Sequence, residues 1–266
     1  MAGRRPMTRA IILAAGQGSR LRPLTDDIPK ALTPLFGRPL VEHQLKTLRD
    51  AGIESIGIVG GYRADRLETL GIPVILNPDF ETTNMVASLA QAADFLQADA
   101  ADTDVVVAYG DIAYEPRNLA AVLGSSKGDI AVMIDTAWRD LWEARFDDPL
   151  SDAETLVMDG DRIVELGRKP EDYSRIEGQF TGLMRIAPGK FADLMAAYHA
   201  LPAGERSGMY MTDFLQGLID GGWDVRAAKV ASGWLEVDTV EDHAIYHSMA
   251  DEGRLAPLFD PAAIWG

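Results

Sequence analysis

The segment Ala10-Ile-Ile-Leu-Ala14 runs directly into Ala15-Gly16-Gln-Gly18. An apolar run that ends at closely spaced glycines is typical of a buried strand followed by a loop. Glycines in such a loop let backbone N–H groups approach phosphate oxygens, because no Cβ intervenes. Two cationic side chains, Arg20 and Lys30, follow in the sequence. These residues predict a phosphate-binding loop at the carboxyl end of a buried strand.

Short apolar runs alternate with helical periodicity along the first half of the chain. This alternation indicates βαβ units and therefore an α/β fold with a doubly wound, mostly parallel, Rossmann-like sheet. Ligands of such sheets bind beyond the carboxyl ends of the strands, where Gly60-Gly61 and Tyr109-Gly110-Asp111 are expected. We predict strands at 10–14, 55–59, 73–76, 104–108 and 130–134, and helices at 39–48 and 85–96.

The second half predicts an antiparallel elaboration of the sheet. Asp159-Gly160-Asp161 lies between two short apolar runs, 156–158 and 162–166, as in a β-hairpin. No linker rich in proline, glycine and serine divides the chain, so we expect a single domain over residues 1–266. Further strands are predicted at 180–186, 225–230 and 234–237, and helices at 190–199, 212–220 and 239–250, the last capped by Asp238 or Thr239.

The composition excludes several classes of partner and site. With 25 basic and 41 acidic residues the net charge is −16, which repels nucleic acid and anionic membranes, so neither is expected to bind. The absence of cysteine excludes disulfides, thiolate zinc sites and cysteine nucleophiles. No apolar run approaches the roughly 18 residues that span a bilayer, and no apolar signal segment follows the basic start. A cytoplasmic location is therefore expected.

The first 50 residues carry nine basic and four acidic side chains, against the trend of the rest of the chain. A basic pocket of this kind suits a small anionic ligand such as a nucleotide. The alternative is an uneven distribution of solvated surface charge, which would have no function of its own.

The segment from Leu13 to Thr25, Leu-Ala-Ala-Gly-Gln-Gly-Ser-Arg-Leu-Arg-Pro-Leu-Thr, followed by Pro29-Lys-Ala-Leu32, resembles the signature of the sugar-1-phosphate nucleotidyltransferase superfamily. The resemblance implies the nucleotidyltransferase fold and transfer of a nucleotidyl group from an NTP to a small phosphorylated acceptor. It also implies a nucleotide-binding half (about 8–135) and an acceptor-binding half (about 136–250). Arg20 and Lys30 are the implied catalytic cations. The implied nucleotide-binding residues are Leu13, Ala14, Ala15, Gly16, Gly18, Ser19 and Gly110.

The resemblance also implies a Mg²⁺ site. Asp111 follows a predicted strand where the family places its first magnesium aspartate, and Glu236 and Asp238 lie where it places a second acidic group. Residues 236 and 238 share one face of an extended segment, so both carboxylates can reach one cation. Mg²⁺ is commonly held by one or two carboxylates together with phosphates and waters. The alternative for any single aspartate is a turn or a helix cap.

Two segments resemble the cytidylyltransferase branch, which includes CTP:phosphocholine cytidylyltransferases of bacterial surface-polymer pathways. These are Asn77-Pro78 and Thr83-Asn-Met-Val-Ala-Ser88. The resemblance favours CTP as the NTP, with Ser88 reading the cytosine edge and Asn84 contacting the base or the acceptor. The alternative is that this segment is only a helix N-terminus capped by Asn84.

The implied acceptor is a small phosphomonoester or phosphonate. Gly167-Arg-Lys-Pro170 resembles a family segment whose lysine contacts the acceptor phosphate, so Lys169 is a further catalytic candidate. The stretch 138–154 resembles relatives that act on phosphocholine, phosphonates or phosphorylated amino acids. The acceptor-binding candidates are Asn84, Glu177, Gln179, Gly182 and Trp138.

The chemistry of the acceptor is left open by these residues. Five aromatic side chains could form a cage for a quaternary amine, although a packing stripe is the alternative for the pair Trp138 and Trp142. Carboxylates and amides, such as Glu154 and Gln179, would instead suit an amino acid or an aminoalkyl phosphonate. The five aromatic residues are Tyr114, Trp138, Trp142, Tyr210 and Trp234.

Two other functions remain open at this point. A hexose-1-phosphate uridylyl- or guanylyltransferase would use the same signature with another base and acceptor. A non-catalytic nucleotide-binding regulatory protein would be expected to have lost Lys30 or an acidic group, and all are present. The spacing of His243 and His247 lacks the acidic residue of a zinc motif, so we interpret both as structural. The sequence is compatible with a homo-oligomer as well as with a monomer.

Overall fold

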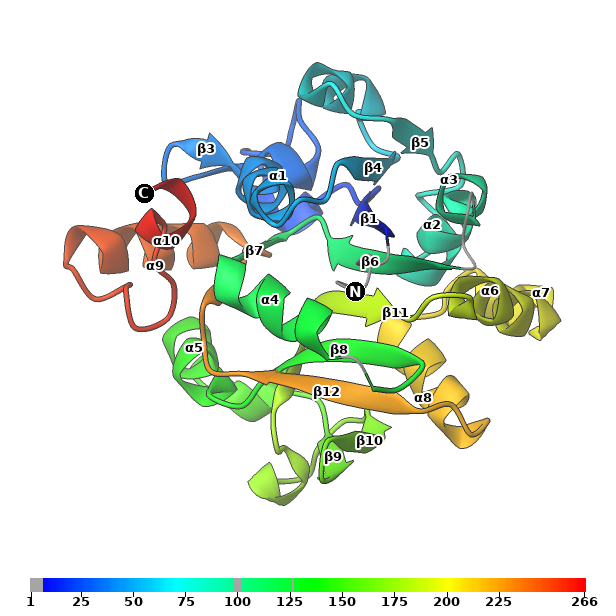
Figure 1. Ribbon diagram of the computed structural model, residues 1–266. Helices are drawn as coiled ribbons and strands as arrows, with labels where there is room; N and C mark the ends of the chain where they lie inside the picture. Colours follow the sequence, from blue (N-terminus) through cyan, green and yellow to red (C-terminus); the bar gives the residue numbers. More distant parts are fainter. Residues whose placement is uncertain (1–6, 98–101, 126) are drawn as a thin grey trace, which may run out of the picture.

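A nine-stranded sheet runs through the structure in the order β5-β4-β1-β6-β11-β8-β12-β10-β9 (Figure 1). The computed structural model describes residues 7–97, 102–125 and 127–266, so Arg4 and Arg5 of the basic N-terminal segment lie outside it. The strands are β1 (Met7–Ala14), β4 (Ser55–Gly60), β5 (Val74–Leu76), β6 (Thr103–Tyr109), β8 (Ile130–Asp135), β9 (Leu156–Asp159), β10 (Arg162–Leu166), β11 (Gln179–Ile186) and β12 (Val225–Val230).

The sheet is mostly parallel, as predicted. β5, β4, β1 and β6 are parallel neighbours, and β8 pairs in parallel with β12. β11 runs antiparallel to both β6 and β8, and the β9–β10 hairpin extends the sheet antiparallel to β12. These antiparallel strands are the predicted elaboration. Residues 10–14 of β1 are at most 8% exposed, as expected for a central strand covered on both faces.

Helices cover both faces of the sheet, and the sheet divides the hydrophobic core into two layers. Alternate side chains of β1 enter opposite layers, Ile12 one and Ile11 the other. The layer containing Ile12 includes α1 (Leu40–Asp50), α4 (Pro116–Gly124), α5 (Trp138–Arg145), α9 (Val240–Asp251) and α10 (Ala262–Trp265). The layer containing Ile11 includes α2 (Met85–Gln91), α3 (Ala93–Gln97), α6 (Lys190–Ala200) and α8 (Met211–Asp220). A short helix, α7 (Ala203–Arg206), precedes α8.

Short elements outside the main sheet position the site. β7 (Ile112–Tyr114) pairs antiparallel with β13 (Trp234–Glu236), with Glu236 opposite Ile112. β2 (Pro34–Leu35) and β3 (Arg38–Pro39) form a two-stranded hairpin. Short 3₁₀ helices lie at Ser19–Leu21, Lys30–Leu32, Ala64–Leu70, Pro149–Ser151 and Tyr173–Arg175.

The structure differs from the predicted elements in a few places. The predicted helix 85–96 is two helices, because Ala92 donates to the carbonyls of Leu89 and Ala90 in a tight turn between α2 and α3. The elements that were not predicted are β2, β3, β7, α4, α5, α7 and α10. Within the described residues, none of the helices is both long and apolar enough to span a membrane.

Candidate functional site

The carboxyl ends of β1 and β6 meet at one edge of the sheet because the two strands are parallel neighbours. The amide of Gly110, just past β6, donates to the carbonyl oxygen of Leu13 at 2.8 Å. A Cβ at Gly110 would lie 2.8 Å from the Cβ of Ala14, which is closer than real Cβ atoms come. Only glycine therefore lets the two strand ends approach so closely.

A pocket of about 140 Å³ opens at this edge. It contains most of the residues predicted to bind the nucleotide, while Gly18 and Ser19 lie outside its lining. Five of its lining residues were not among the predicted site residues: Ala31, Phe80, Thr83, Met85 and Tyr109. The lining residues are Leu13, Ala14, Ala15, Gly16, Lys30, Ala31, Phe80, Thr83, Asn84, Met85, Ser88, Tyr109, Gly110 and Asp111.

Gly18 and Ser19 shape the loop that carries the two predicted cations. Gly18 has a φ of 64°, and a Cβ there would lie 3.0 Å from the Cβ of Lys30. The hydroxyl of Thr25 donates to the Gly18 carbonyl at 2.7 Å and so closes the loop. Ser19 begins the 3₁₀ helix that carries Arg20. The loop thus folds back onto the lysine it precedes.

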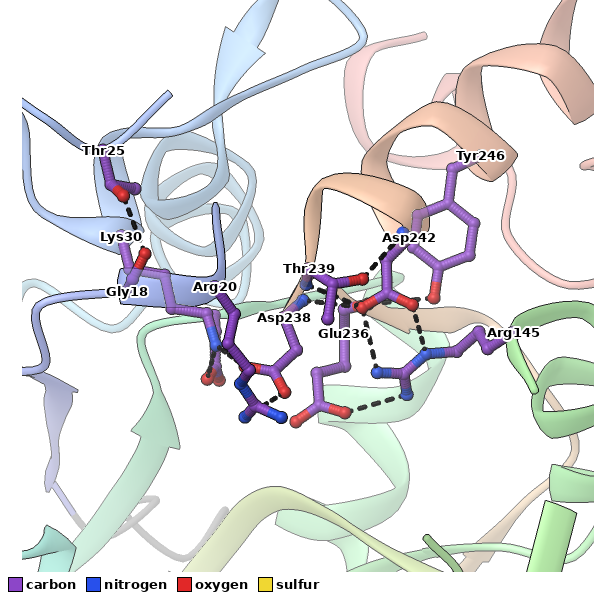
Figure 2. A network of polar contacts seen from close by, with 11 residues as sticks. Gly18, Arg20, Thr25, Lys30, Arg145, Glu236, Asp238, Thr239, Asp242 and Tyr246 are labelled. Atoms are coloured by element: carbon purple, nitrogen blue, oxygen red, sulfur yellow. Dashed lines mark hydrogen bonds and ion pairs between the residues drawn. The ribbon is translucent and has the colours of Figure 1, made fainter. Parts of the chain in front are cut away.

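Lys30 lies between two of the predicted acidic residues (Figure 2). Its Nζ is 2.8 Å from Oδ2 of Asp111 and 2.6 Å from Oδ1 of Asp238, and Arg20 forms an ion pair with the other oxygen of Asp238. The pairing of β7 with β13 explains this convergence, since the amide of Val237 donates to the Asp111 carbonyl at 3.0 Å. The cations expected to form a basic pocket therefore carry acidic counter-charges.

Electrostatics keeps the lysine charged. Burial disfavours the ammonium ion, but the carboxylates of Asp111 and Asp238 outweigh this effect and raise the pKa of Lys30. The side chains of all three residues are only partly exposed, at 14–18%. Lys30 is consequently a fixed positive charge at the wall of the pocket.

A second network holds Glu236 in place (Figure 2). Nη1 of Arg145 is 2.9 Å from Oε2 of Glu236, and Nε and Nη2 donate to the two oxygens of Asp242 at 2.9 and 3.2 Å. Oδ2 of Asp242 also accepts hydrogen bonds from the amides of Asp238 at 3.0 Å and Thr239 at 2.9 Å. The ion pair of Arg145 and Asp242 thus fixes the segment that carries two of the three predicted metal ligands, Glu236 and Asp238.

Asp242 and Arg145 were not predicted as site residues. The spacing of Thr239 and Asp242 is that of a capping box, and both reciprocal hydrogen bonds of that motif are formed at the start of α9. This motif was the available signal for Asp242. Arg145 lies in a distant helix and has no local signal. Burial raises the pKa of Glu236, whereas the charge of Arg145 acts to lower it.

The site fits a Mg²⁺ ion that is completed by ligand oxygens. In the described residues no three histidine or acidic side chains converge as a ready-made metal site. Oδ1 of Asp111 is nevertheless buried and has no hydrogen-bond partner, so it is free to coordinate a cation. Asp111 and Asp238 supply the one or two carboxylates that Mg²⁺ commonly takes with phosphates and waters. Arg145 already binds one oxygen of Glu236, the third predicted ligand.

Two acceptor candidates lie at or beside the pocket. Asn84 lines it and caps α2 by accepting from the amide of Met85 at 2.8 Å, so the helix-cap interpretation also holds. Gly182 has a φ of 85°, and a Cβ there would lie 2.6 Å from the ring of Tyr109. Gly182 therefore makes room for a pocket-lining aromatic side chain.

The remaining candidates make structural contacts in this conformation. Gln179 exchanges hydrogen bonds with the backbone of Glu154, at 3.0 and 2.6 Å. Glu177 accepts from the amide of Met158 at 3.2 Å. The ammonium of Lys169 donates to the carbonyls of Leu150 and Ser151, at 2.6 and 2.7 Å, which places it at the short helix Pro149–Ser151 rather than at Lys30.

The aromatic residues considered for a cage mostly belong to the core. Trp138 is 6% exposed, meets the ring of Trp142 edge-on and stacks on Tyr173. Tyr114, Trp142 and Trp234 are at most 4% exposed, while Tyr210 is 59% exposed. Packing accounts for the contacts of four of these five rings.

Glu154 is a half-buried carboxyl group that forms no ion pair with a cation in the described part of the chain. Burial raises its pKa to about 7, with further contributions from Asp213 and Asp152. Between this value and the ordinary value near 4.5, the folded protein binds a proton that the unfolded chain does not. The carboxylate therefore destabilises the fold above pH 7, and this penalty disappears as the pH falls towards 4.5.

We expect Glu154→Gln to raise stability at pH 8 by about 1–2 kcal/mol, a value discounted for partial exposure, and to have little effect near pH 5. Thermal melting at both pH values measures this. Glu165→Gln is a control of opposite sign, because a hydrogen bond from Arg175 lowers the pKa of Glu165. A Glu154→Gln protein no more stable than the wild type at pH 8 would contradict the prediction.

Comparisons with known proteins agree with this architecture. A family model described as the MobA-like NTP transferase domain matches residues 10–198. The chain is 36% identical over 245 residues to the CTP:phosphoglutamine cytidylyltransferase of Campylobacter jejuni, covering 88% of this chain and 96% of that protein. It is 40% identical over 85 residues to a choline-phosphate cytidylyltransferase of Streptococcus pneumoniae, covering 30% of this chain and 37% of that protein.

The fold is also that of a solved nucleotidyltransferase. The structure of the inositol-1-phosphate CTP transferase from T. maritima superposes with a TM-score of 0.69 at 22% identity, over 94% of this chain and 98% of that one. This likeness confirms the predicted nucleotidyltransferase fold. The family match covers most of the chain and includes the strands that build the pocket. It shows that the chain is an enzyme of the MobA-like NTP transferase family.

Proposed function

We propose that this protein is a Mg²⁺-dependent cytidylyltransferase. It would join CTP to a small phosphomonoester or phosphonate acceptor and release pyrophosphate, as a cytoplasmic enzyme. The observation that carries the proposal is Lys30, a fixed cation in the wall of the pocket that is paired with Asp111 and Asp238. The choice of CTP is supported by the similarity to the CTP:phosphoglutamine cytidylyltransferase of Campylobacter jejuni.

The proposed reaction is an in-line displacement at the α-phosphorus of CTP. An acceptor phosphate oxygen attacks that phosphorus, a new P–O bond forms, and the bond to the β-phosphate oxygen breaks as pyrophosphate leaves. An ionised phosphate is already nucleophilic, so no general base is required. The protein's part is to bring two polyanions together and to offset charge at the α-phosphate.

In this mechanism Lys30 and Arg20 bind the triphosphate and the leaving pyrophosphate. Asp111 and Asp238, with Glu236 beside them, would hold the Mg²⁺ ion, which when bound supplies further positive charge at the phosphates. Lys169 would guide the acceptor only after leaving the carbonyls of Leu150 and Ser151.

Pyrophosphate release tests the proposal directly. The protein is assayed with Mg²⁺, each of the four NTPs in turn, and a pool of phosphocholine, phosphoethanolamine, aminoethylphosphonate, phosphorylated amino acids and hexose-1-phosphates. Release with CTP and the non-sugar acceptors supports the proposal. Release with UTP or GTP and the sugar phosphates favours a hexose-1-phosphate nucleotidyltransferase. NTP binding by calorimetry without any release favours a regulatory protein.

A further inference from the structure

A buried asparagine lies behind one wall of the pocket. Asn77 follows β5 and is 1% exposed, and it does not line the pocket itself. Its amide nitrogen, Nδ2, is 3.0 Å from Oγ of Ser88 and 3.0 Å from Oγ1 of Thr83. Both hydroxyl-bearing residues do line the pocket, so Asn77 can influence a ligand only through them.

The orientation of the Asn77 amide is fixed by the backbone. The N–H of Asp79 points at Oδ1 of Asn77, with an N–O distance of 3.1 Å. A backbone N–H can only donate, so the atom facing it must be the carbonyl oxygen. The NH₂ group therefore faces the two hydroxyls, and each hydroxyl accepts a hydrogen bond from it.

This arrangement directs the hydrogen of the Ser88 hydroxyl towards the pocket. Thr83 passes its own hydrogen to the carbonyl oxygen of Asp79, at 2.8 Å. In the described part of the chain no protein acceptor is recorded for the hydrogen of Ser88, which is 5% exposed. A ligand that used Ser88 only as an acceptor would leave this hydrogen unpaired, at a cost of about 1–3 kcal/mol.

Resting on the proposed function, we propose that Asn77 is a positioning residue that sets base specificity by making Ser88 a donor to N3 of cytosine. N3 of cytosine is an acceptor, whereas N3 of uracil carries a hydrogen and can only donate. The wall of the pocket thus matches CTP and opposes UTP. A site built to hydrogen-bond one group discriminates strongly against an analogue that leaves its buried polar atoms unpaired.

Asn77→Asp reverses this polarity with almost no change of shape. Oδ1 still accepts from Asp79, but the second oxygen now accepts from Ser88 and turns its hydrogen away from the pocket. The ratio of kcat/KM for CTP to that for UTP should fall about tenfold or more. Ser88→Ala, which removes the hydroxyl and adds no buried charge, should also lower the ratio, and it remains informative if the aspartate variant fails to fold.

Asn118→Asp is the matched control. Asn118 is also completely buried, and its Nδ2 donates to the backbone carbonyls of Ser232 and Gly233 at 3.1 and 3.0 Å, away from the pocket. The same substitution there should leave the CTP-to-UTP ratio unchanged even if it lowers stability. A readout of relative specificity therefore separates positioning of Ser88 from a general loss of structure.

The two proposals fail in different ways. Equal losses for CTP and UTP in both the Asn77 and the Ser88 variants, or a wild-type preference for UTP, would overturn the role of Asn77 while leaving nucleotidyl transfer intact. If the wild type transfers no nucleotide, the function proposal fails. The Kd for UTP divided by the Kd for CTP, measured by calorimetry on the wild type and the same variants, then tests Asn77. A ratio that falls in both the Asn77 and the Ser88 variants supports its role, and an unchanged ratio overturns it.

Discussion

Replacing Lys30 by methionine lowers the turnover number of nucleotidyl transfer by about 10²-fold or more, as expected for the loss of one charge that stabilises a transition state. The ammonium lies 2.8 Å from Asp111 and 2.6 Å from Asp238, so its removal also leaves two carboxylates facing each other. Their negative charge would then repel the incoming triphosphate. Pyrophosphate release with CTP and a competent acceptor measures the effect.

Lys46→Met is the matched control for this substitution. Lys46 lies on α1, is 37% exposed and pairs with Asp50 on the same helix, outside the pocket lining. The same change there should leave turnover within about twofold, because exposed ion pairs contribute little. A folded Lys30→Met enzyme with the full wild-type rate would remove Lys30 from the mechanism.

Replacing Arg145 by methionine has the second largest expected effect, on both stability and turnover. The Arg145 and Asp242 side chains are 2% and 3% exposed, so the substitution strands a buried carboxylate. Breaking a buried ion pair in this way costs about 3–5 kcal/mol. Glu236 loses its anchor, and Asp242, which binds the amide of Asp238, loses the arginine that holds it. Turnover should therefore fall about 10-fold to 10²-fold even below the melting temperature.

The metal dependence distinguishes positioning from simple destabilisation. If Arg145 positions Glu236 and Asp238, the Mg²⁺ concentration for half-maximal activity rises while the Kd for CTP changes little. Arg145→Lys keeps the charge but loses the bidentate geometry, so an intermediate value is expected. Arg139→Met, an exposed arginine on the same helix, is the control. Normal turnover and metal dependence in a folded Arg145→Met protein would contradict this role.

Much of the fold could be predicted because it rests on local patterns. The apolar run at 10–14, the Asp-Gly hairpin turn at 159–161 and the cap of α9 at Thr239 each follow from a short segment, and the structure contains all three. The segment of α4 also contains a local helix signal. Pro116 stands at its first turn, where the missing N–H costs nothing.

Other unpredicted features depend on distant partners. β7 has only three residues, and nothing within them specifies that they pair with β13. Arg145 likewise reveals its role only through Glu236 and Asp242, which are 91 and 97 residues away in the sequence. Motif resemblance identified Lys30, Asp111 and Asp238, and the structure brings them together. It could not reveal that Lys169 is held by neighbouring carbonyls, because those contacts depend on how the loop folds.

The ion pair between Lys30 and Asp238 joins residues 208 positions apart in the sequence. Closing so long a loop costs conformational entropy before any contact repays it, so such contacts form late in folding. The β1 strand and its glycine loop can assemble from the first part of the chain, but the complete cluster needs β13 as well. During synthesis, a partly made chain would hold the phosphate loop without the counter-charges of Lys30. Recovery of catalytic activity after denaturation should therefore lag behind recovery of secondary structure.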